Sequence, residues 1–268
     1  MLLLLLILCG ILAGIIAGLF GLGGGILFTP ILYFLFTSYS LADPATWAIG
    51  TSLFCTFTAS VSSSVQQRKH RNFYWKEGVI VGLLGSFGVY FGKKMVLSDF
   101  YTEQVFVAVF SILLLVVALL FYRKSKGDVV KHTGSEKTGF LKFSATGGFG
   151  GFVAALAGVG GGIVMVPVMN LLLKLKMTKA VSISSLAIVF ISLSGWLQFA
   201  FFAGSPDGIT GYRLGYVDFG TGLPLILGAF AGGFMGVWIG KRIPQKFVQL
   251  GFSALIASIA ILMIRSIL

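Results

Sequence analysis

The stretch GIIAGLFGLGGGILFTP, residues 14–30, returns 137 residues further on as GFVAALAGVGGGIVMVP, residues 151–167. The triple glycine and the proline fall at the same places in both copies. Two weaker matches follow in the same order: Ser52 corresponds to Ser184 at an offset of 132, and residues 88–94 correspond to 236–242 at an offset of 148. Three ordered matches indicate a duplicated unit, with an insertion near residues 204–215 in the second copy.

The composition indicates that both copies are embedded in lipid. Of the 268 residues, 57% are hydrophobic and only 10% are charged, whereas soluble domains carry roughly 25% charged residues. Residues 105–122 and 250–264 contain no charge, and about 20 apolar residues span a bilayer as a helix. Because lipid cannot satisfy open backbone groups, the chain is predicted to be an all-α polytopic membrane protein.

Charges, glycines and prolines divide the chain into two repeats of about five hydrophobic segments each. The first membrane repeat occupies residues 1–122, a basic linker follows at 123–142, and the second repeat occupies 143–268. We expect the N-terminal apolar run to be a retained first helix. The predicted segments lie at about 2–20, 24–37, 45–66, 77–97 and 103–122, then 143–158, 162–173, 180–203, 217–240 and 246–266.

The loop charges predict the orientation of these segments. If the linker lies in the cytoplasm, 16 Lys and Arg residues fall in cytoplasmic loops and 4 fall on the other side, which is the bias that sets membrane topology. Both termini then lie outside, and each half has an odd number of segments. The two halves are therefore predicted to be inverted repeats, an architecture typical of transporters.

The remaining inventory argues against several other classes of protein. The net charge of +12 comes from short loop clusters, so we expect lipid and not nucleic acid as a partner. Cys9 and Cys55 lie in apolar segments, and His70 and His132 lie in basic loops. These residues form no recognisable catalytic, metal or cofactor site, so no enzyme is predicted. The sequence does not indicate an oligomeric state.

The glycine-rich motifs are the sharpest local feature of both repeats. Three consecutive glycines disfavour a helix interior by about 1 kcal/mol each, and Pro30 and Pro167 are expected to break or limit the short segments that follow. The first two segments of each repeat are therefore predicted to be short and broken. One alternative is close helix packing through small residues. The other is a half-helix whose free N–H groups point at an anion.

The polar side chains in the segments also fit an anion. Glu77 and Asp218 lie only at segment starts, so no carboxylate in a segment centre would repel a negative substrate. Neutral donors follow each glycine motif at a similar interval. The residues predicted to bind the substrate are Gly23, Gly24, Gly25, Thr51, Ser52, Gly160, Gly161, Gly162, Ser184 and Ser185.

In these motifs the sequence resembles the sulfite exporter TauE/SafE family of membrane permeases. The resemblance rests on the elements Gly21 to Pro30 and Gly158 to Pro167, on residues 48–53 with their echo at 180–186, and on Gly92-Lys93 with Gly240-Lys241. It implies a plasma-membrane transporter, and an exporter, of sulfite, organosulfonates or other sulfur-containing anions. A permease of the same architecture for a carboxylate is an alternative. A membrane enzyme or assembly factor is a third reading, for which the chain offers no nucleophile–base pair.

The charge bias makes the first testable prediction. A cysteine at position 135, in the basic linker, should resist labelling by an impermeant thiol reagent added outside intact cells, in a background without Cys9 and Cys55. The same cysteine should label after the membrane is permeabilised. Efficient external labelling would contradict the predicted orientation.

Overall fold

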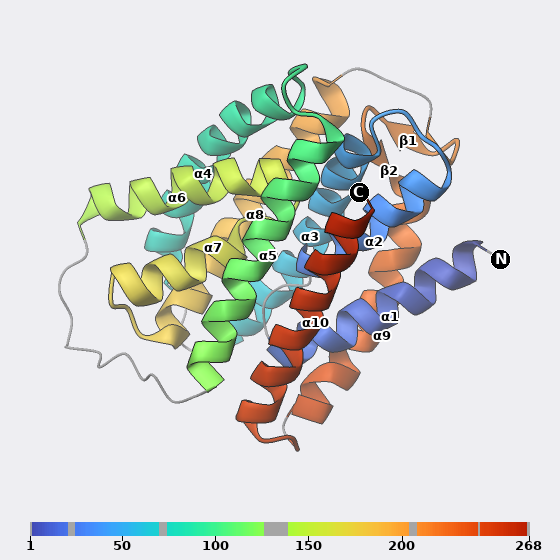
Figure 1. The fold of residues 1–268 in the computed structure, drawn as a ribbon. Coiled ribbons are helices and arrows are strands. Elements are labelled where there is room, and N and C mark those ends of the chain that lie inside the picture. Colours follow the sequence, from blue (N-terminus) through green and yellow to red (C-terminus); the bar gives the residue numbers. More distant parts are fainter. Residues whose placement is uncertain are drawn as a thin grey trace.

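The protein is described by a computed structural model that covers residues 2–20, 25–69, 74–125, 139–203, 208–240 and 242–266. Within these ranges the chain is almost entirely helical (Figure 1). The first half forms α1 (Leu2–Phe20), α2 (Gly25–Ser38), α3 (Pro44–Lys69), α4 (Trp75–Val96) and α5 (Glu103–Ser125). The second half forms α6 (Phe140–Ala157), α7 (Gly162–Pro167), the π-helical turn η1 (Val168–Leu172), α8 (Met177–Phe201), α9 (Phe219–Gly240) and α10 (Gln245–Arg265).

The prediction of an all-α polytopic membrane protein is confirmed. Among the described residues, six helices are long and apolar enough to cross a bilayer, namely α3, α4, α5, α6, α8 and α9. The helix bounds differ from the predicted segments by a few residues. The strands in the described part of the chain are a short antiparallel pair, β1 (Arg213–Leu214) and β2 (Val217–Asp218), next to the predicted insertion. Residues 126–138 of the predicted linker lie outside the described ranges.

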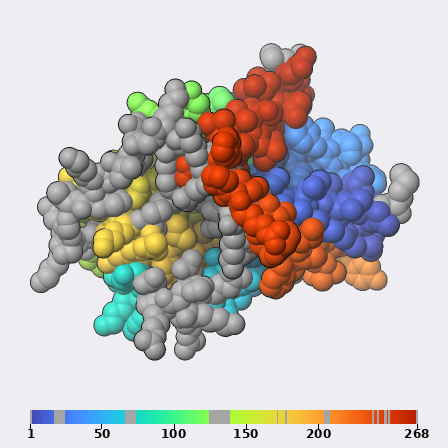
Figure 2. Space-filling model, turned by 90° about the horizontal axis from the view of Figure 1, so that it is seen from below, coloured from blue at the N-terminus to red at the C-terminus, as the bar shows by residue number. Residues whose placement is uncertain are grey.

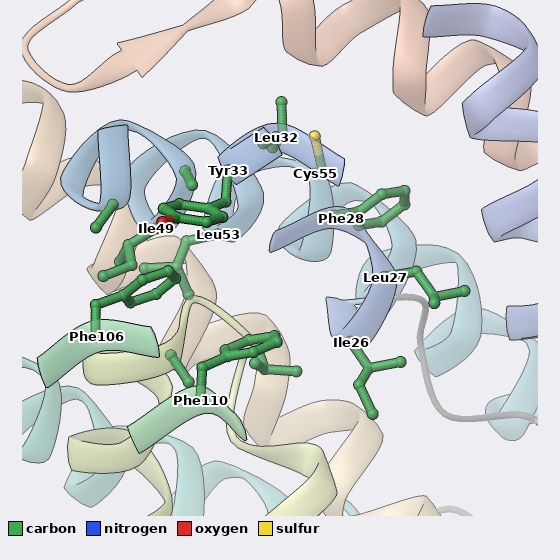
Figure 3. Packing of buried hydrophobic residues seen from close by; sticks show 14 of the residues in the cluster. Ile26, Leu27, Phe28, Leu32, Tyr33, Ile49, Leu53, Cys55, Phe106 and Phe110 are labelled. Atoms are coloured by element: carbon green, nitrogen blue, oxygen red, sulfur yellow. The ribbon is translucent and has the colours of Figure 1, made fainter. Parts of the chain in front are cut away.

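The largest buried cluster joins α2, α3 and α5. Tyr33 of α2 and Phe106 of α5 are fully enclosed, with ring centroids 5.3 Å apart. Ile49 and Leu53 of α3 fill the space beside them, and Phe110 continues the cluster along α5 (Figure 3). The Tyr33 hydroxyl donates to Glu103 Oε1 over 2.7 Å, so its polar end has a partner. This cluster fixes the short helix α2 against the long helix α3.

Each half contributes its first helix to a close pair with the fourth helix of the other half. Along α1 and α9, a Cβ on Gly228, Gly232 or Gly236 would collide with the backbone of Ile7, Ile11 or Ile15. The rising order on both helices means that they run in the same direction, and Figures 1 and 2 show α1 lying along α9. Small residues at four-residue spacing permit this backbone contact in a membrane.

The pair α4 and α6 is built in the same way. A Cβ on Gly147 would collide with the backbone of Val81, and one on Gly151 would collide with that of Gly85. A second glycine face of α4 receives α8, because Gly78 lies against Leu186 and Gly82 against Phe190. These contacts also make α4, α6 and α8 parallel to one another.

The helices α5 and α10 run in opposite directions beside each other (Figure 1). Ser253 donates to the carbonyl of Ala118 over 2.8 Å, and Ser111 donates to that of Ala260 over 3.5 Å. Helices α3 and α8 are also antiparallel, since Leu53 lies against Gly195 and Ser63 donates to Ser185. The pattern of contacts is reciprocal between the two halves.

Charged contacts at the helix ends follow the same directions. Lys179, near the start of α8, lies 3.5 Å from Glu77 near the start of α4. Lys93, near the end of α4, donates to the carbonyl of Phe202 just after α8 over 3.4 Å. The starts of α4 and α8 therefore lie together at one end of the parallel pair. Which end faces the cytoplasm stays a prediction.

The glycine contacts between α1 and α9 predict a sharp difference between two neighbouring positions. Gly232→Ala would press a methyl group onto the Ile11 backbone and should lower stability by about 1–3 kcal/mol. Gly233→Ala is the control, because its Cβ would meet only the Gly14 carbonyl, at 4.0 Å. Alanine also favours helix over glycine, so this variant should match or exceed the wild type in thermal unfolding in detergent. Equal unfolding temperatures would contradict the packing described.

Candidate anion site at the glycine-rich breaks

The second glycine motif ends one helix and begins the next. Helix α6 stops at Ala157, and Gly158 caps it with φ 70°, its N–H donating to the carbonyl of Ala154 over 2.8 Å. Gly160 and Gly161 have φ of 68° and 78°, and α7 begins at Gly162. Residues with a Cβ rarely adopt this conformation. The three glycines are therefore required by the turn itself.

In the first half, the break falls at the corresponding place. Helix α1 ends at Phe20 and α2 begins at Gly25. Gly23 and Gly24, which were predicted to bind the substrate, lie outside the described residues. Gly25 is described, and it is buried at the N-terminus of α2.

The two prolines do not act alike. The prediction that Pro30 breaks its helix is wrong, because α2 continues through it to Ser38. Pro30 is the sixth residue of α2, where it removes one backbone donor and leaves the turns on both sides intact. Pro167 ends α7, and the chain continues as the π-helical turn η1, in which Leu173 N–H donates to the carbonyl of Val168 over 3.2 Å.

The break in the second half lies against the start of α2. A Cβ placed on Gly25 would stand 3.0 Å from the carbonyl oxygen of Val159 and 2.7 Å from Thr56 Oγ1. A Cβ on Gly158 would stand 2.9 Å from Thr29 Oγ1 and 3.0 Å from the Ile49 Cα. Thr56 is the thirteenth of the 26 residues of α3. The described parts of the two breaks therefore meet beside the middle of this long helix.

We call the place where the start of α2 meets the Gly158–Gly161 turn the junction. Ser52 forms hydrogen bonds to both of its parts. Its hydroxyl donates to the carbonyl oxygen of Gly158 over 2.8 Å. Thr29 Oγ1 lies 2.8 Å from Ser52 Oγ, and since Ser52 has only one proton, Thr29 is the donor of this second bond. Ser52 was predicted to bind the substrate, but in this structure its hydrogen bonds satisfy the backbone of the break.

Thr51 has a different neighbour. Its Oγ1 accepts the backbone N–H of Asp218 over 3.1 Å. Asp218 is fully buried and caps the start of α9, with Oδ1 accepting the N–H of Thr221 and Oδ2 that of Thr210, both over 3.1 Å. Sequence reasoning placed Asp218 at a segment start but did not predict its burial. A carboxylate before a helix with threonine three residues later is the pattern of an N-cap and was a usable signal.

The chain around β1 and β2 covers the same end of α3. Tyr216 N–H donates to the carbonyl of Phe199, and the Tyr216 carbonyl lies against Gly50. The Tyr216 hydroxyl is 3.4 Å from Asp43 Oδ2. Burial and this carboxylate raise the pKa of Tyr216, so the phenol stays neutral and donates. The insertion in the second repeat thus anchors the N-terminal end of α3.

Ser184 and Ser185 were predicted to bind the substrate, and the structure gives each of them other close neighbours. A Cβ on Gly162 would stand 2.5 Å from Ile188 Cδ1 and 3.6 Å from Ser184 Oγ. Ser184 is therefore near the start of α7, with the side chain of Ile188 closer. Ser185 donates to the carbonyl of Val181 in its own helix over 2.8 Å and accepts from Ser63 over 3.4 Å.

Gly160 and Gly161 face different neighbours. A Cβ on Gly161 would stand 2.6 Å from the carbonyl of Gly150 in α6. A Cβ on Gly160 would stand between α3 and α8, 2.6 Å from Thr56 Cγ2 and 2.9 Å from Ile188 Cγ2. Of the two, Gly160 faces the junction.

Thr56 was not among the predicted binding residues. It is 2% exposed, and its Oγ1 has no hydrogen-bond partner among the residues that the structure describes. In the described part of the chain, no group of three or more His, Cys, Asp or Glu residues is placed to hold a metal ion. The junction is lined by helix N-termini, hydroxyls and apolar groups.

These features place the chain in a class of proteins. A helical membrane protein whose interrupted helices meet in its interior has the architecture of a membrane transporter. Three similar proteins carry the name "probable membrane transporter protein". The chain is 29% identical over 264 residues to one from Methanocaldococcus jannaschii, covering 98% of this chain and 96% of the relative. It is 28% identical over 261 residues to YunE of Bacillus subtilis (91% and 90%) and 26% identical over 271 residues to a Haemophilus influenzae protein (97% of both).

Residues 6–263 match the family described as sulfite exporter TauE/SafE. The chain belongs to this family, as its glycine motifs indicated, and it is a membrane transporter. No solved structure gives a significant match.

The bonds of Ser52 give a prediction for stability. Ser52→Ala would leave the Gly158 carbonyl without this donor in a buried place and should lower stability by about 1–3 kcal/mol. Ser60→Ala on the same helix is the matched control, because the Ser60 hydroxyl donates only to Phe57, within α3. It should have a clearly smaller effect in thermal unfolding. If the Ser52→Ala protein were as stable as the Ser60→Ala protein, the hydrogen bonds of Ser52 would not stabilise the contact between the breaks.

Proposed function

We propose that this transporter carries small sulfur-containing anions, such as sulfite or organosulfonates, across the plasma membrane, and that it acts as an exporter. The observation that carries the proposal is the meeting of the start of α2 with the Gly158–Gly161 turn beside the middle of α3. The family description names sulfite export, and this supports the choice of sulfur over other anions.

The chemistry of the junction favours an anion over a cation. Helix α2 has 14 residues, and the first-turn N–H groups of a helix lack intrahelical partners and carry partial positive charge. Thr56 supplies a neutral hydroxyl nearby that has no partner among the described residues. The buried carboxylate of Asp218 is held at the start of α9 by N–H donors. Its contact on α3 is Thr51, which precedes Thr56 by more than one helical turn. A weakly charged site of this kind can release its ligand as well as bind it.

Transport requires that the site open to each side in turn. We propose that the two halves are inverted repeats that exchange conformations, with the linker in the cytoplasm and both termini outside. The chain of contacts described above makes α1 parallel to α9 and α6 parallel to α4 and α8, while α3 opposes α8. These opposite directions of corresponding helices support the inverted relation, and a site halfway along α3 suits alternating access.

A flux assay in proteoliposomes tests the proposal. Sulfite, sulfate, sulfoacetate and acetate are supplied separately, with protein-free liposomes as the control. We expect saturable flux of at least one sulfur anion and no saturable binding of Na⁺ or choline. Flux of acetate alone would identify a carboxylate permease. Binding of a cation without flux of any anion would overturn the proposed function.

A further inference from the structure

Two corresponding positions in the duplicated halves differ in polarity. Thr56 and Ile188 are separated by 132 residues, the same offset that relates Ser52 to Ser184. In the structure each faces the glycine that begins the short helix of its own half. A Cβ on Gly25 would stand 2.7 Å from Thr56 Oγ1, and one on Gly162 would stand 2.5 Å from Ile188 Cδ1. One helix start therefore has a hydroxyl beside it and the other a hydrocarbon.

Gly160 brings the two side chains into one place. Its missing Cβ would touch both Thr56 Cγ2 and Ile188 Cγ2, at 2.6 and 2.9 Å. Thr56 of α3 and Ile188 of α8 therefore both lie against Gly160. Both present a methyl group to Gly160, while Thr56 directs its Oγ1 towards Gly25.

The hydroxyl of Thr56 differs from those of its neighbours. Thr29, Ser52 and Thr51 all have partners within the protein. Thr56 Oγ1 is buried, is directed at Gly25, and has no partner among the described residues. Burying a hydroxyl without a hydrogen bond is unfavourable, so an unpartnered hydroxyl beside a helix N-terminus indicates a ligand that satisfies it.

The start of α7, the corresponding position in the second half, has no unpartnered hydroxyl of this kind beside it among the described residues. Helix α7 has only six residues, and the Ile188 side chain lies directly against its first residue. Isoleucine has no group that can bind a charged oxygen, and it would remove water from an anion without compensation.

We propose that Thr56 is the side-chain ligand of the transported anion, donating its hydroxyl proton to one oxygen while the first-turn N–H groups of α2 bind the same head group. Ile188 makes the corresponding place in the second half apolar, so that the protein binds one oxyanion head group, in its first half. The recognised chemistry is an anionic oxygen of a sulfite, sulfonate or carboxylate head. This inference rests on the proposed function, because it assigns a residue to the same site.

Two substitutions separate the hydroxyl from the shape of Thr56. Thr56→Val keeps the volume and replaces Oγ1 by a methyl group, whereas Thr56→Ser keeps the hydroxyl and removes the methyl group that faces Gly160. Ile188→Val is the matched control, because it removes only the Cδ1 methyl group that lies against Gly162 and changes no polar atom. All four proteins are purified as the full chain in detergent.

The experiment measures equilibrium binding of sulfite, methanesulfonate and acetate, together with thermal unfolding without ligand. For every anion that the wild type binds, Thr56→Val should weaken binding about tenfold to a hundredfold, the loss expected for one hydrogen bond to a charged group. Thr56→Ser should stay within about threefold of the wild type, since the donor remains, and Ile188→Val should bind like the wild type.

The unfolding temperature without ligand gives an independent readout. Because the Thr56 hydroxyl lacks a partner, Thr56→Val should unfold at the same or a higher temperature than the wild type. A structural hydroxyl would give the opposite result, a lower unfolding temperature. Weaker binding in a protein that is no less stable therefore supports a ligand role.

Wild-type affinity in Thr56→Val, or a loss of ligand-free stability that accounts for the weaker binding, would overturn this inference and leave the proposed function standing. If the wild type binds none of the three anions, the proposed function fails, and the inference fails with it.

Discussion

The structure depends on backbone that leaves the helical conformation inside a membrane protein. Lipid offers no partner for a free N–H or C=O, so such backbone must be satisfied by the protein or must line a place for a ligand. Gly158, Gly160 and Gly161 make the turn possible through their positive φ angles. The Gly158 N–H returns to its own helix, and its carbonyl receives Ser52 of the other half. This bond connects the two halves directly at the turn.

Glycine serves two separate purposes in this chain, and the structure assigns them to different places. Within helices, glycines outside the two triple-glycine motifs let α1 approach α9 and α4 approach α6 until their backbones touch. At residues 158–161, the glycines provide conformations that other residues avoid, and there the broken-helix interpretation is correct. The helix pairs α1–α9 and α4–α6 form much of the framework around the turn, and the turn forms one part of the junction.

The hydroxyls near the junction differ in whether they already have hydrogen-bond partners. Most of them satisfy backbone groups that the break and the helix ends leave open, as Ser52 does for Gly158 and Thr51 for Asp218. Thr56 stands apart because nothing in the described chain satisfies it. Asp218 is buried nearby, but its charge is already held by N–H groups at the start of α9.

The sequence by itself determined the membrane class, the helix positions, the break at the second glycine motif and the family, because hydrophobicity, loop charge and glycine runs are local properties of the chain. It also determined that Thr51, Ser52, Ser184 and Ser185 lie on the helices that enclose the breaks. It misjudged Pro30, since a proline near a helix start removes one donor without ending the helix. Only the tertiary structure decided that Ser52 and Thr51 are already bonded and that Thr56 Oγ1 has no partner among the described residues. That difference depends on the partners that α2, α6 and α9 bring to α3 from distant parts of the chain, and no local pattern records them.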